Sequence, residues 1–362
     1  MNNIDSLYEL PWKKDEYEKQ SWGHSLHRIG PYVGRIKPSF AHFLVKYLSK
    51  PNETILDPFC GIGTIPLEAA LQGRNSIGFD INPYAIAIAK AKTQIDLDPQ
   101  RLEKIIRKID INTESVNLNN FPSWVLDFYN QKTFKEILFL LDYFKRNNHY
   151  YLYGCLLAIS QGHRPGHLSK PSAWTLPYKP KDDDPGEYRD TKKRLIEKVR
   201  RNLKDGSLNE NLMKIIKKDI RNLNIEPNSI DTIITSPPYF NTLDYINSHR
   251  LRLAVMGVYK DKDKKKLSEK TIQNKNSYLE EMEKIIKDLK IVLKPNGICC
   301  FVLGDLKNSK EDINTSKLIN RIFENNSFEY ITTINDTIPI NKSIQKRSGT
   351  PKVERILIVK NG

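Results

Sequence analysis

The sequence predicts an α/β fold in which helices cover a mostly parallel β-sheet. Three short apolar runs, at residues 54–56, 76–79 and 230–234, have the composition of buried strands. The first two are each followed by a segment with apolar side chains at helical spacing. Such an alternation of strand and helix along the chain is typical of a parallel sheet.

The clearest alternation lies in the first third of the chain. Five elements are expected there: a helix at residues 39–48, a strand at 54–56, a helix at about 65–73, a strand at 76–79 and a helix at 85–92. Prolines suit the helix starts, since Pro38 and Pro83 precede two of them and Pro66 lies in the first turn of the third. Gly73 suits a C-terminal cap. The first helix is expected to pack beside the loop after the first strand.

The alternation is interrupted between residues 98 and 211. This stretch contains helical segments rich in aromatic side chains, a polar loop at residues 160–167 and a basic segment. We therefore predict an inserted, mainly helical domain at 98–211, and a second domain formed by residues 1–97 and 212–362 together.

Strands and helices alternate again after the interruption. Strands are expected at residues 213–216, 230–235 and 298–303, with a helix at 277–292. Two further apolar runs, at residues 330–334 and 353–359, predict a closing hairpin of edge strands.

The composition indicates a soluble, cytoplasmic enzyme. The 362 residues are 39% hydrophobic and 28% charged, and no apolar stretch approaches the roughly 20 residues that a membrane helix needs. The polar N-terminus lacks the apolar core of a secretory signal. The cysteines show no paired Cys-x-x-Cys spacing and are expected to be reduced thiols: Cys60, Cys155, Cys299 and Cys300.

The net charge of +15 favours a polyanionic partner. Much of the excess is concentrated at residues 192–204 and 260–266. Lysine and arginine neutralise phosphates and release counterions, so these runs favour a nucleic acid. The alternative for each single run is a solvated surface without a partner.

The first motif that carries chemistry is the segment 57–64, with the sequence DPFCGIGT. Gly61 and Gly63 leave backbone N–H groups open to a ligand at a helix N-terminus, which favours a negative group such as a carboxylate. Asp80 follows Asp57 by about the separation at which an acidic residue usually binds ribose hydroxyls. A dinucleotide loop would have a third glycine where this chain has Pro66, so we predict S-adenosylmethionine rather than NAD.

The second motif is the segment 235–239, with the sequence TSPPY. An exocyclic amine of a nucleobase is a poor nucleophile, because its lone pair is delocalised into the ring. Acceptors that favour a tetrahedral nitrogen activate it, and Ser236 Oγ and the Pro237 carbonyl can supply them. Pro237 and Pro238 fix the backbone, and Tyr239 offers a face on which an extruded base can stack. No metal is needed for this chemistry.

Together the motifs resemble the S-adenosylmethionine-dependent amino-methyltransferases of DNA, and within them the cytosine-N4 branch. The resemblance covers about residues 24–97 and 213–362, including segments at 27–38 and 293–297. It implies a class I methyltransferase fold, which is Rossmann-like with a mostly parallel, seven-stranded sheet, and S-adenosyl-L-methionine as the cofactor.

The resemblance also implies roles for individual residues. The catalytic residues are then Ser236, Pro237, Pro238 and Tyr239. The cofactor-binding residues are Asp57, Pro58, Phe59, Cys60, Gly61, Gly63, Thr64, Asp80, Ile81, Asn82, Asp219 and Ile220, with Asp80 at the ribose and Asp219 near the adenine. The substrate-binding residues are Asn241, Asp244, Tyr245, His249 and Arg250. For His249 and Arg250 the alternative is a pairing with Asp244.

The order of the motifs is similar to the alpha group of this family, in which the insertion recognises the target. The resemblance therefore implies that residues 98–211 read double-stranded DNA from which a base is flipped. Candidates for base or phosphate contacts are Arg164, Lys170, Lys179, Arg189, Arg194 and Arg200, each with ordinary surface charge as the alternative. A cognate restriction endonuclease or proteins of a defence system are candidate partners.

Ser236 bears on which atom is methylated. In the family, serine at this position is typical of cytosine N4, whereas aspartate is usual for adenine N6. Adenine N6 stays open, because some members with serine methylate adenine, and RNA guanine N2 is a third alternative. A nucleic-acid-binding protein with a decayed methyltransferase core is disfavoured, because no ligand position of the two motifs is missing.

Two other segments have less specific interpretations. His163 and His167 are separated by Pro165, so a metal-binding helix face is not expected there. Residues 260–275 are predicted to be either a mobile loop that closes over DNA or a solvated linker.

Overall fold

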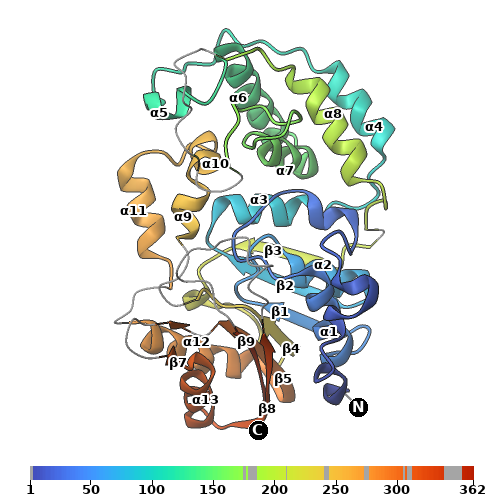
Figure 1. The fold of residues 1–362 in the computed structure, drawn as a ribbon, viewed down its shortest axis with the longest axis vertical. Helices are drawn as coiled ribbons and strands as arrows, with labels where there is room; N and C mark the ends of the chain where they lie inside the picture. The colour runs from blue at the N-terminus through green and yellow to red at the C-terminus, as the bar shows by residue number, and fades with distance from the viewer. Residues whose placement is uncertain are drawn as a thin grey trace.

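The protein consists of a twisted sheet with helices on both faces and a helical layer stacked above it (Figure 1). The computed structural model describes residues 3–173, 177, 186–208, 210–239, 244–272, 277–304, 306–307, 312–337 and 353–362. The main sheet has seven strands in the order β3-β2-β1-β4-β5-β9-β8. Antiparallel pairing involves only β9 within this sheet, since β9 runs against both of its neighbours, β5 and β8.

The strands of the main sheet are β1 (Thr54–Asp57), β2 (Asn75–Asp80), β3 (Met213–Lys217), β4 (Ile230–Thr235), β5 (Leu293–Gly304), β8 (Phe328–Thr337) and β9 (Val353–Asn361). A separate antiparallel pair is formed by β6 (Leu306–Lys307) and β7 (Asp312–Ile313). The helices that pack on the main sheet are α1 (Pro38–Leu48), α2 (Thr64–Leu71), α3 (Pro83–Ala91), α12 (Tyr278–Val292) and α13 (Thr315–Asn325).

The described part of residues 98–211, the predicted insertion, contains the helices α4 (Pro99–Lys108), α5 (Ser123–Leu126), α6 (Gln131–Arg146), α7 (Tyr150–Ile159) and α8 (Thr191–Asn202). Three more follow the second motif: α9 (Tyr245–Ser248), α10 (Arg250–Val255) and α11 (Asp261–Glu269). Short 3-10 helices are η1 (Ile4–Leu7), η2 (Pro11–Lys13), η3 (Asp15–Glu18), η4 (Ser25–Arg28) and η5 (Ile220–Asn222).

The predicted α/β class and the mostly parallel seven-stranded sheet are confirmed. The hairpin of the C-terminal strands is present, because β8 pairs with β9. The prediction that both are edge strands is wrong for β9, which lies between β5 and β8. Its apolar run is buried on both faces, since Leu357 packs into one hydrophobic cluster and its neighbours Ile356 and Ile358 pack into another.

The same alternation explains the short apolar runs of the central strands. In β1, Leu56 faces the cluster formed with α12 and α13, whereas Ile55 faces the cluster formed with α1. In β4, Ile233 packs into the cluster with α12 and α13, and Ile234 packs into the cluster with α1. Strands that are covered on both faces read as continuous apolar runs.

The helices of the insertion stack on α3 rather than standing apart from the sheet (Figure 1). One hydrophobic cluster contains Tyr84 and Ile88 of α3 together with Phe134 of α6, Leu156 of α7 and Val199 of α8. Residues of the predicted insertion therefore share a hydrophobic core with α3, one of the helices that cover the sheet.

The segment predicted as a mobile loop or linker at residues 260–275 is described up to residue 272. Helix α11 occupies most of it, and its first turn contains Asp261 and Asp263. Residues 273–276 lie outside the described part of the chain.

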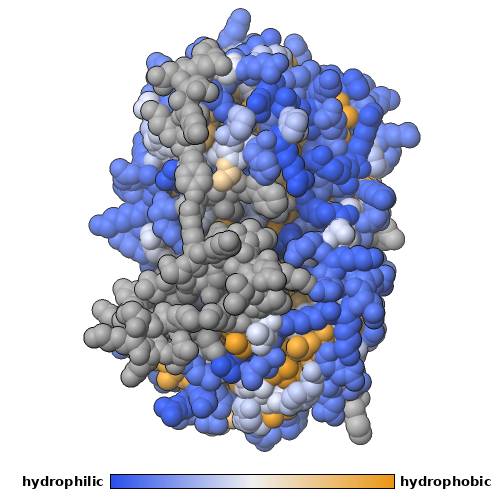
Figure 2. All heavy atoms as spheres, in the orientation of Figure 1, coloured by the Kyte–Doolittle hydropathy of each residue, from blue (hydrophilic) through white to orange (hydrophobic). Residues whose placement is uncertain are grey.

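Much of the face shown in Figure 2 is hydrophilic over the helical layer that contains α4 and α8. Basic side chains of α8 are partly engaged within the protein, because Arg200 pairs with Glu103 of α4. Among the described residues, no helix is long and apolar enough to cross a membrane.

Candidate active site

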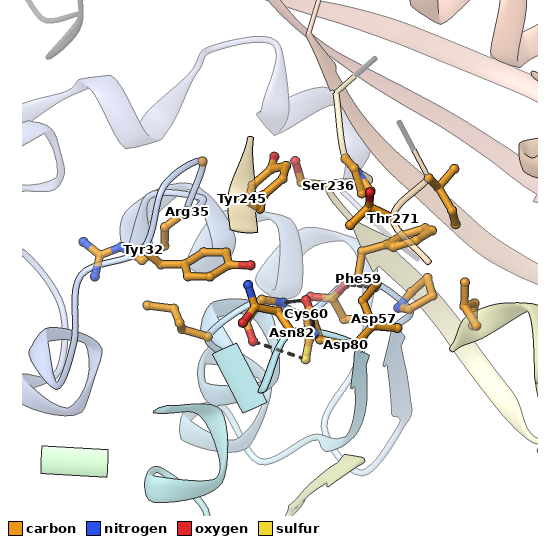
Figure 3. Close-up of a pocket in the computed structure, with 18 of the residues that line it drawn as sticks. Tyr32, Arg35, Asp57, Phe59, Cys60, Asp80, Asn82, Ser236, Tyr245 and Thr271 are labelled. Carbon is orange, nitrogen blue, oxygen red and sulfur yellow. Dashed lines mark hydrogen bonds between the residues drawn. The ribbon is translucent and has the colours of Figure 1, made fainter. Parts of the chain in front are cut away.

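A cavity with about 960 Å³ of empty space, including its open mouth, lies at the carboxyl ends of β1, β2 and β4. Both sequence motifs contribute to its wall, since Asp57, Gly61 and Asp80 line it together with Ser236 (Figure 3). Further predicted residues that line it are Pro58, Phe59, Cys60, Thr64, Ile81, Asn82, Asp219, Ile220, Pro238 and Tyr245. Parallel strands place their carboxyl ends along one edge, and ligands of open α/β sheets bind there.

The loop between β1 and α2 is folded onto the end of β2. Gly61 and Gly63 have positive φ angles of 51° and 71°, a backbone conformation that residues with a Cβ rarely adopt. The Gly61 N–H donates to Asp80 Oδ2 at 2.9 Å, and the Cys60 N–H donates to the Phe79 carbonyl at 2.8 Å. Gly63 forms the N-cap of α2 and does not line the cavity.

Asp57 joins the two motifs directly. It ends β1 and accepts a hydrogen bond at Oδ1 from the Thr235 hydroxyl, at the end of β4, over 2.7 Å. The Phe59 N–H donates to the same oxygen at 3.2 Å. Burial raises the pKa of Asp57 to about 7, because a charged carboxylate loses its hydration there.

Asp80 is held by backbone donors at the tip of β2. Besides the Gly61 N–H, the Asn82 N–H donates to Oδ1 at 2.7 Å. Burial raises the pKa of Asp80 to about 6, although these hydrogen bonds favour the ionised form. Asn82 in turn caps α3, since its Oδ1 accepts from the Tyr84 N–H at 3.0 Å.

Aromatic side chains form the wall opposite the loop. Tyr32 lies over Gly61, where an added Cβ would approach the Tyr32 ring to 3.3 Å. The Tyr32 ring stacks on Tyr245 with centroids 6.0 Å apart, and on His249 with centroids 4.8 Å apart. Both tyrosines line the cavity, whereas His249 lies behind Tyr32 and is fully buried.

His249 is therefore placed as a support for Tyr32. Its Nε2 accepts the Val33 N–H over 3.4 Å, and burial holds the pKa of the imidazole well below its ordinary value. Because Nε2 accepts a hydrogen bond and the pKa is lowered, the His249 imidazole is neutral.

The remaining residues predicted to bind substrate are dispersed. Asp244 is exposed and caps α9 by accepting the Asn247 N–H at 2.9 Å. The Arg250 guanidinium donates to the Pro177 carbonyl at 2.6 Å and lies over the Trp124 ring. Asn241 lies outside the described residues, as does Lys179.

The tetrapeptide 236–239 presents two of its four residues to the cavity. Ser236 and Pro238 line it, whereas Pro237 is buried beneath. The Pro238 carbonyl accepts a hydrogen bond from the Tyr278 hydroxyl at 3.2 Å. This bond connects the tetrapeptide to α12, which packs on the main sheet. Tyr239 points its hydroxyl towards Glu354 of β9, with 2.9 Å between the two oxygens.

Asp219 lines the far end of the cavity but is already paired. The Arg221 guanidinium donates Nε to Asp219 Oδ1 at 2.9 Å and Nη2 to Oδ2 at 2.7 Å. This side-chain pairing lowers the pKa of Asp219, despite burial that raises it. Arg221 also donates to Glu281 of α12 and to the Lys270 carbonyl after α11.

Several wall residues were not predicted individually. Those are Tyr32, Gly34, Arg35, Ile36, Ile62, Ile65, Lys218, Ile246, Leu267, Lys270, Thr271 and Ile272. The first four fall in the segment 27–38, and the resemblance of this segment to the methyltransferase family was the available signal. No local signal marks Leu267 to Ile272, because their part in the wall depends on how α11 returns to the sheet.

No group of three or more histidine, cysteine, aspartate or glutamate side chains within the described residues has the arrangement of a metal site. His163 and His167 lie in the loop after α7. The described cysteines are buried free thiols.

The chain matches the family model described as DNA methylase, of the N6/N4 type, at residues 8–91 and 230–362. It is 27% identical over 282 residues to the type II methyltransferase M.BsoBI of Geobacillus stearothermophilus, covering 65% of this chain and 53% of that protein. It is 35% identical over 102 residues to the type II methyltransferase M.MjaII of Methanocaldococcus jannaschii, covering 28% of this chain and 19% of that protein. The chain thus spans about half or less of the length of these relatives.

Solved structures with a similar arrangement include a SAM-dependent methyltransferase of Methanosarcina mazei, at 12% identity and a TM-score of 0.36, covering 88% of this chain and 96% of that one. Another is a TehB-like SAM-dependent methyltransferase of Corynebacterium glutamicum, at 9% identity and a TM-score of 0.33, covering 88% and 85%. Both scores are low, so the assignment rests on the sequence matches. Because the residues matched by the family model make up more than half of the chain and include both motifs of the cavity, this chain belongs to the DNA methylase family of N6/N4 amino-methyltransferases.

Proposed function

We propose that this protein is a site-specific DNA methyltransferase that transfers a methyl group from S-adenosyl-L-methionine to the exocyclic N4 amine of a flipped-out cytosine. The observation that carries the proposal is the shared cavity, in which Cys60 and Asp80 lie on one side and Ser236 on the other. A donor and an acceptor bound in one cavity of this size are brought within reacting distance.

The residues of the cavity fit the cofactor that the family uses. Thr64 lines the wall, and its Oγ1 is buried without a hydrogen-bond partner among the described residues, so we assign it to the carboxylate of the amino acid part of the cofactor. The N-terminus of α2 begins at the same point and favours a negative group. Asp80 can accept the ribose hydroxyls, and Phe59, Ile81 and Ile220 supply apolar surface for the adenine.

When bound, S-adenosylmethionine supplies an electrophilic methyl carbon on a sulfonium. Ser236 Oγ and the Pro237 carbonyl accept hydrogen bonds from the target amine and orient its lone pair. Pro237 and Pro238 hold this geometry, because neither has a flexible φ angle. The rings of Tyr32 and Tyr245 present π-electrons to the cavity, which favour a positive charge. Tyr239 does not line the cavity itself, so the extruded base reaches its face only at the edge of the cavity, beside Pro238.

Ser236 also supports cytosine N4 as the target. The family includes both N6 and N4 enzymes, and adenine N6 is the alternative substrate. In the resemblance described above, serine at this position is typical of cytosine. The relatives M.BsoBI and M.MjaII are both called type II methyltransferases, which supports a sequence-specific DNA substrate and a cognate endonuclease as a partner.

The insertion supplies the recognition of the DNA site in this proposal. Residues 98–211 contribute much of the helical layer above the sheet, and α8 in this layer carries basic residues in its last turn. Arg189 and Arg194 both donate to the His167 carbonyl, so they also order the loop after α7. Arg200 is paired with Glu103 and contacts DNA only if it leaves this partner.

The test is methyl transfer from tritiated cofactor to defined duplexes, followed by mass spectrometry of the nucleosides. N4-methylcytosine is expected, whereas N6-methyladenine would establish the alternative. Ser236→Ala should lower turnover by about 100-fold and leave cofactor affinity, measured by calorimetry, within about twofold of wild type.

A matched control is Ser229→Ala, because Ser229 precedes the opposite end of β4 and its hydroxyl donates to the Glu226 carbonyl, away from the cavity. It should retain wild-type turnover. Wild-type turnover in Ser236→Ala would exclude the role given to this hydroxyl.

A further inference from the structure

Tyr239 connects the tetrapeptide to a carboxylate that lies 115 residues further along the chain. Its hydroxyl donates to Glu354 Oε1 at 2.9 Å. Burial raises the pKa of the Tyr239 hydroxyl well above its ordinary value, and hydrogen bonding by the neighbouring Ser236 side chain acts against this rise. Ser236 lines the cavity, whereas Tyr239 and Glu354 do not, so the three side chains form a line that leads away from the reacting atoms.

The sheet makes this line possible. Glu354 lies near the start of β9, opposite Gly304 at the end of β5 and Asp336 on β8. Because β9 runs antiparallel, its start lies at the edge where β4 ends and the tetrapeptide begins. A strand in the usual parallel direction would place its first residues at the opposite edge of the sheet.

We propose that Glu354 fixes Tyr239 and, through the Tyr239 and Ser236 hydroxyls, receives the proton that the target amine loses during methyl transfer. This inference rests on the proposed function. In it Glu354 is a positioning residue and the end of the proton path, and it does not touch the substrate.

The step balances without a further reactant. The amine nitrogen forms a bond to the methyl carbon, the bond from this carbon to sulfur breaks, and sulfur keeps the electron pair. One proton of the methylated nitrogen passes to Ser236 Oγ as the serine proton passes to Tyr239 and the tyrosine proton passes to the Glu354 carboxylate. Glu354 is partly exposed, so it can then release the proton to solvent.

The charges around Glu354 suit an acceptor. Burial raises its pKa to about 6, with Asp336 raising it further and Lys13 and the Tyr239 hydrogen bond lowering it. Asp336 is itself engaged, because Trp12 Nε1 donates to it at 2.6 Å and Lys13 pairs with it. At neutral pH Glu354 is ionised and ready to accept, and it becomes unable to accept as the pH falls below about 6.

The experiment measures single-turnover methyl transfer to duplex DNA from pH 5 to 9, with saturating cofactor. In the wild type the rate constant should fall as the pH decreases through about 6, the pKa of Glu354. Glu354→Gln keeps an acceptor for the Tyr239 hydroxyl but cannot take a proton. It should lower the rate constant by about 100-fold and remove the acidic limb. The cofactor dissociation constant of the variant, measured by calorimetry, should equal that of the wild type at each pH.

Two variants show whether the path runs through Tyr239. Tyr239→Phe should lower the rate constant as much as Glu354→Gln does. The double variant should lose no further activity, because both substitutions interrupt the same proton path. Glu354→Asp should restore part of the rate constant together with the acidic limb. Glu329→Gln on β8 is the control, since Glu329 is exposed, pairs with Lys360 and should leave the profile unchanged.

The outcomes separate this inference from the proposed function. A wild-type protein that binds cofactor but methylates no DNA overturns both. A wild-type protein that methylates DNA, together with a Glu354→Gln variant that keeps the rate constant and the acidic limb, overturns only the proton path.

Discussion

At the scale of single residues, the site depends on carboxylates that are buried but still able to ionise. Asp57 and Asp80 both have raised pKa values because burial removes hydration, and each accepts backbone hydrogen bonds that limit the rise. Their charge at neutral pH is therefore sensitive to the ligand. A ligand that donates hydrogen bonds to Asp80 favours its ionised form.

Cofactor affinity should depend on pH through Asp80. Since the pKa of Asp80 is about 6 in the cofactor-free protein, affinity should fall by about tenfold per pH unit below this value, as protonation removes the acceptor. Asp80→Asn should bind more weakly at pH 7.5 and lose this dependence. Calorimetric titrations from pH 5 to 8 test this, with the exposed Asp110→Asn as control.

The same shift predicts the sign of a stability effect. In the unfolded chain an aspartate releases its proton near pH 4, whereas folded Asp80 retains its proton up to about pH 6. The folded state therefore binds more protons between these values, and the free energy of unfolding should decrease as the pH rises through this window.

The affinity prediction has its own contradicting outcome. If Asp80→Asn bound the cofactor as tightly as the wild type at pH 7.5, Asp80 would not have the role assigned to it at the ribose.

At the scale of elements, the contact between α3 and α7 sets the distance between the insertion and the sheet. Gly154 lies in the middle of α7, and a Cβ there would approach Ala91 Cβ to 2.5 Å. Small residues on both helices let the backbones come close. Helix propensity alone disfavours glycine at such a position, so packing explains it better than local preference.

Gly154→Ala should destabilise the protein although alanine is the better helix former. The overpacking costs about 1–3 kcal/mol and exceeds the gain of about 1 kcal/mol in propensity. Chemical denaturation should show a lower midpoint with the same slope. Gly166→Ala, where a Cβ meets no atom within 4 Å, should be neutral, and an equally neutral Gly154→Ala would disprove the close packing.

At the scale of the whole molecule, Arg252 links the insertion to the sheet. It is fully buried in α10, donates Nη2 to the Gln161 carbonyl at 2.8 Å and lies over the ring of Tyr84 on α3. Together with the shared hydrophobic cluster, this contact couples the inserted helices to the sheet that holds the site.

We therefore expect one cooperative unfolding transition, with the same midpoint for the insertion and the sheet. Arg252→Met should lower the free energy of unfolding by about 2–3 kcal/mol, because it leaves the buried Gln161 carbonyl unpaired. Arg146→Met, which breaks an exposed pair with Asp142, should cost less than about 1 kcal/mol. Two separate transitions in the wild type would show that the insertion is an independent unit.

Local patterns predicted much of the fold and part of the site. Runs such as Ile230 to Thr235 identify buried strands because both faces of a central strand are apolar, and proline and glycine mark helix ends within one turn. The status of β9 was misjudged, since strand order is not encoded in the strand itself. Among the predicted site residues, the structure places Asp57, Asp80 and Ser236 in one cavity, and the roles assigned to them stay predictions.

The order of amino acids is enough to define the two motifs, because a loop with spaced glycines and a segment with paired prolines act through their own backbone over a few residues. The tertiary structure alone decided which distant side chains join them. Tyr32 reaches the cavity from the N-terminal segment, and Glu354 reaches Tyr239 only because β9 enters the sheet antiparallel beside β5. Such contacts depend on strand order and direction, which arise from the packing of the whole chain.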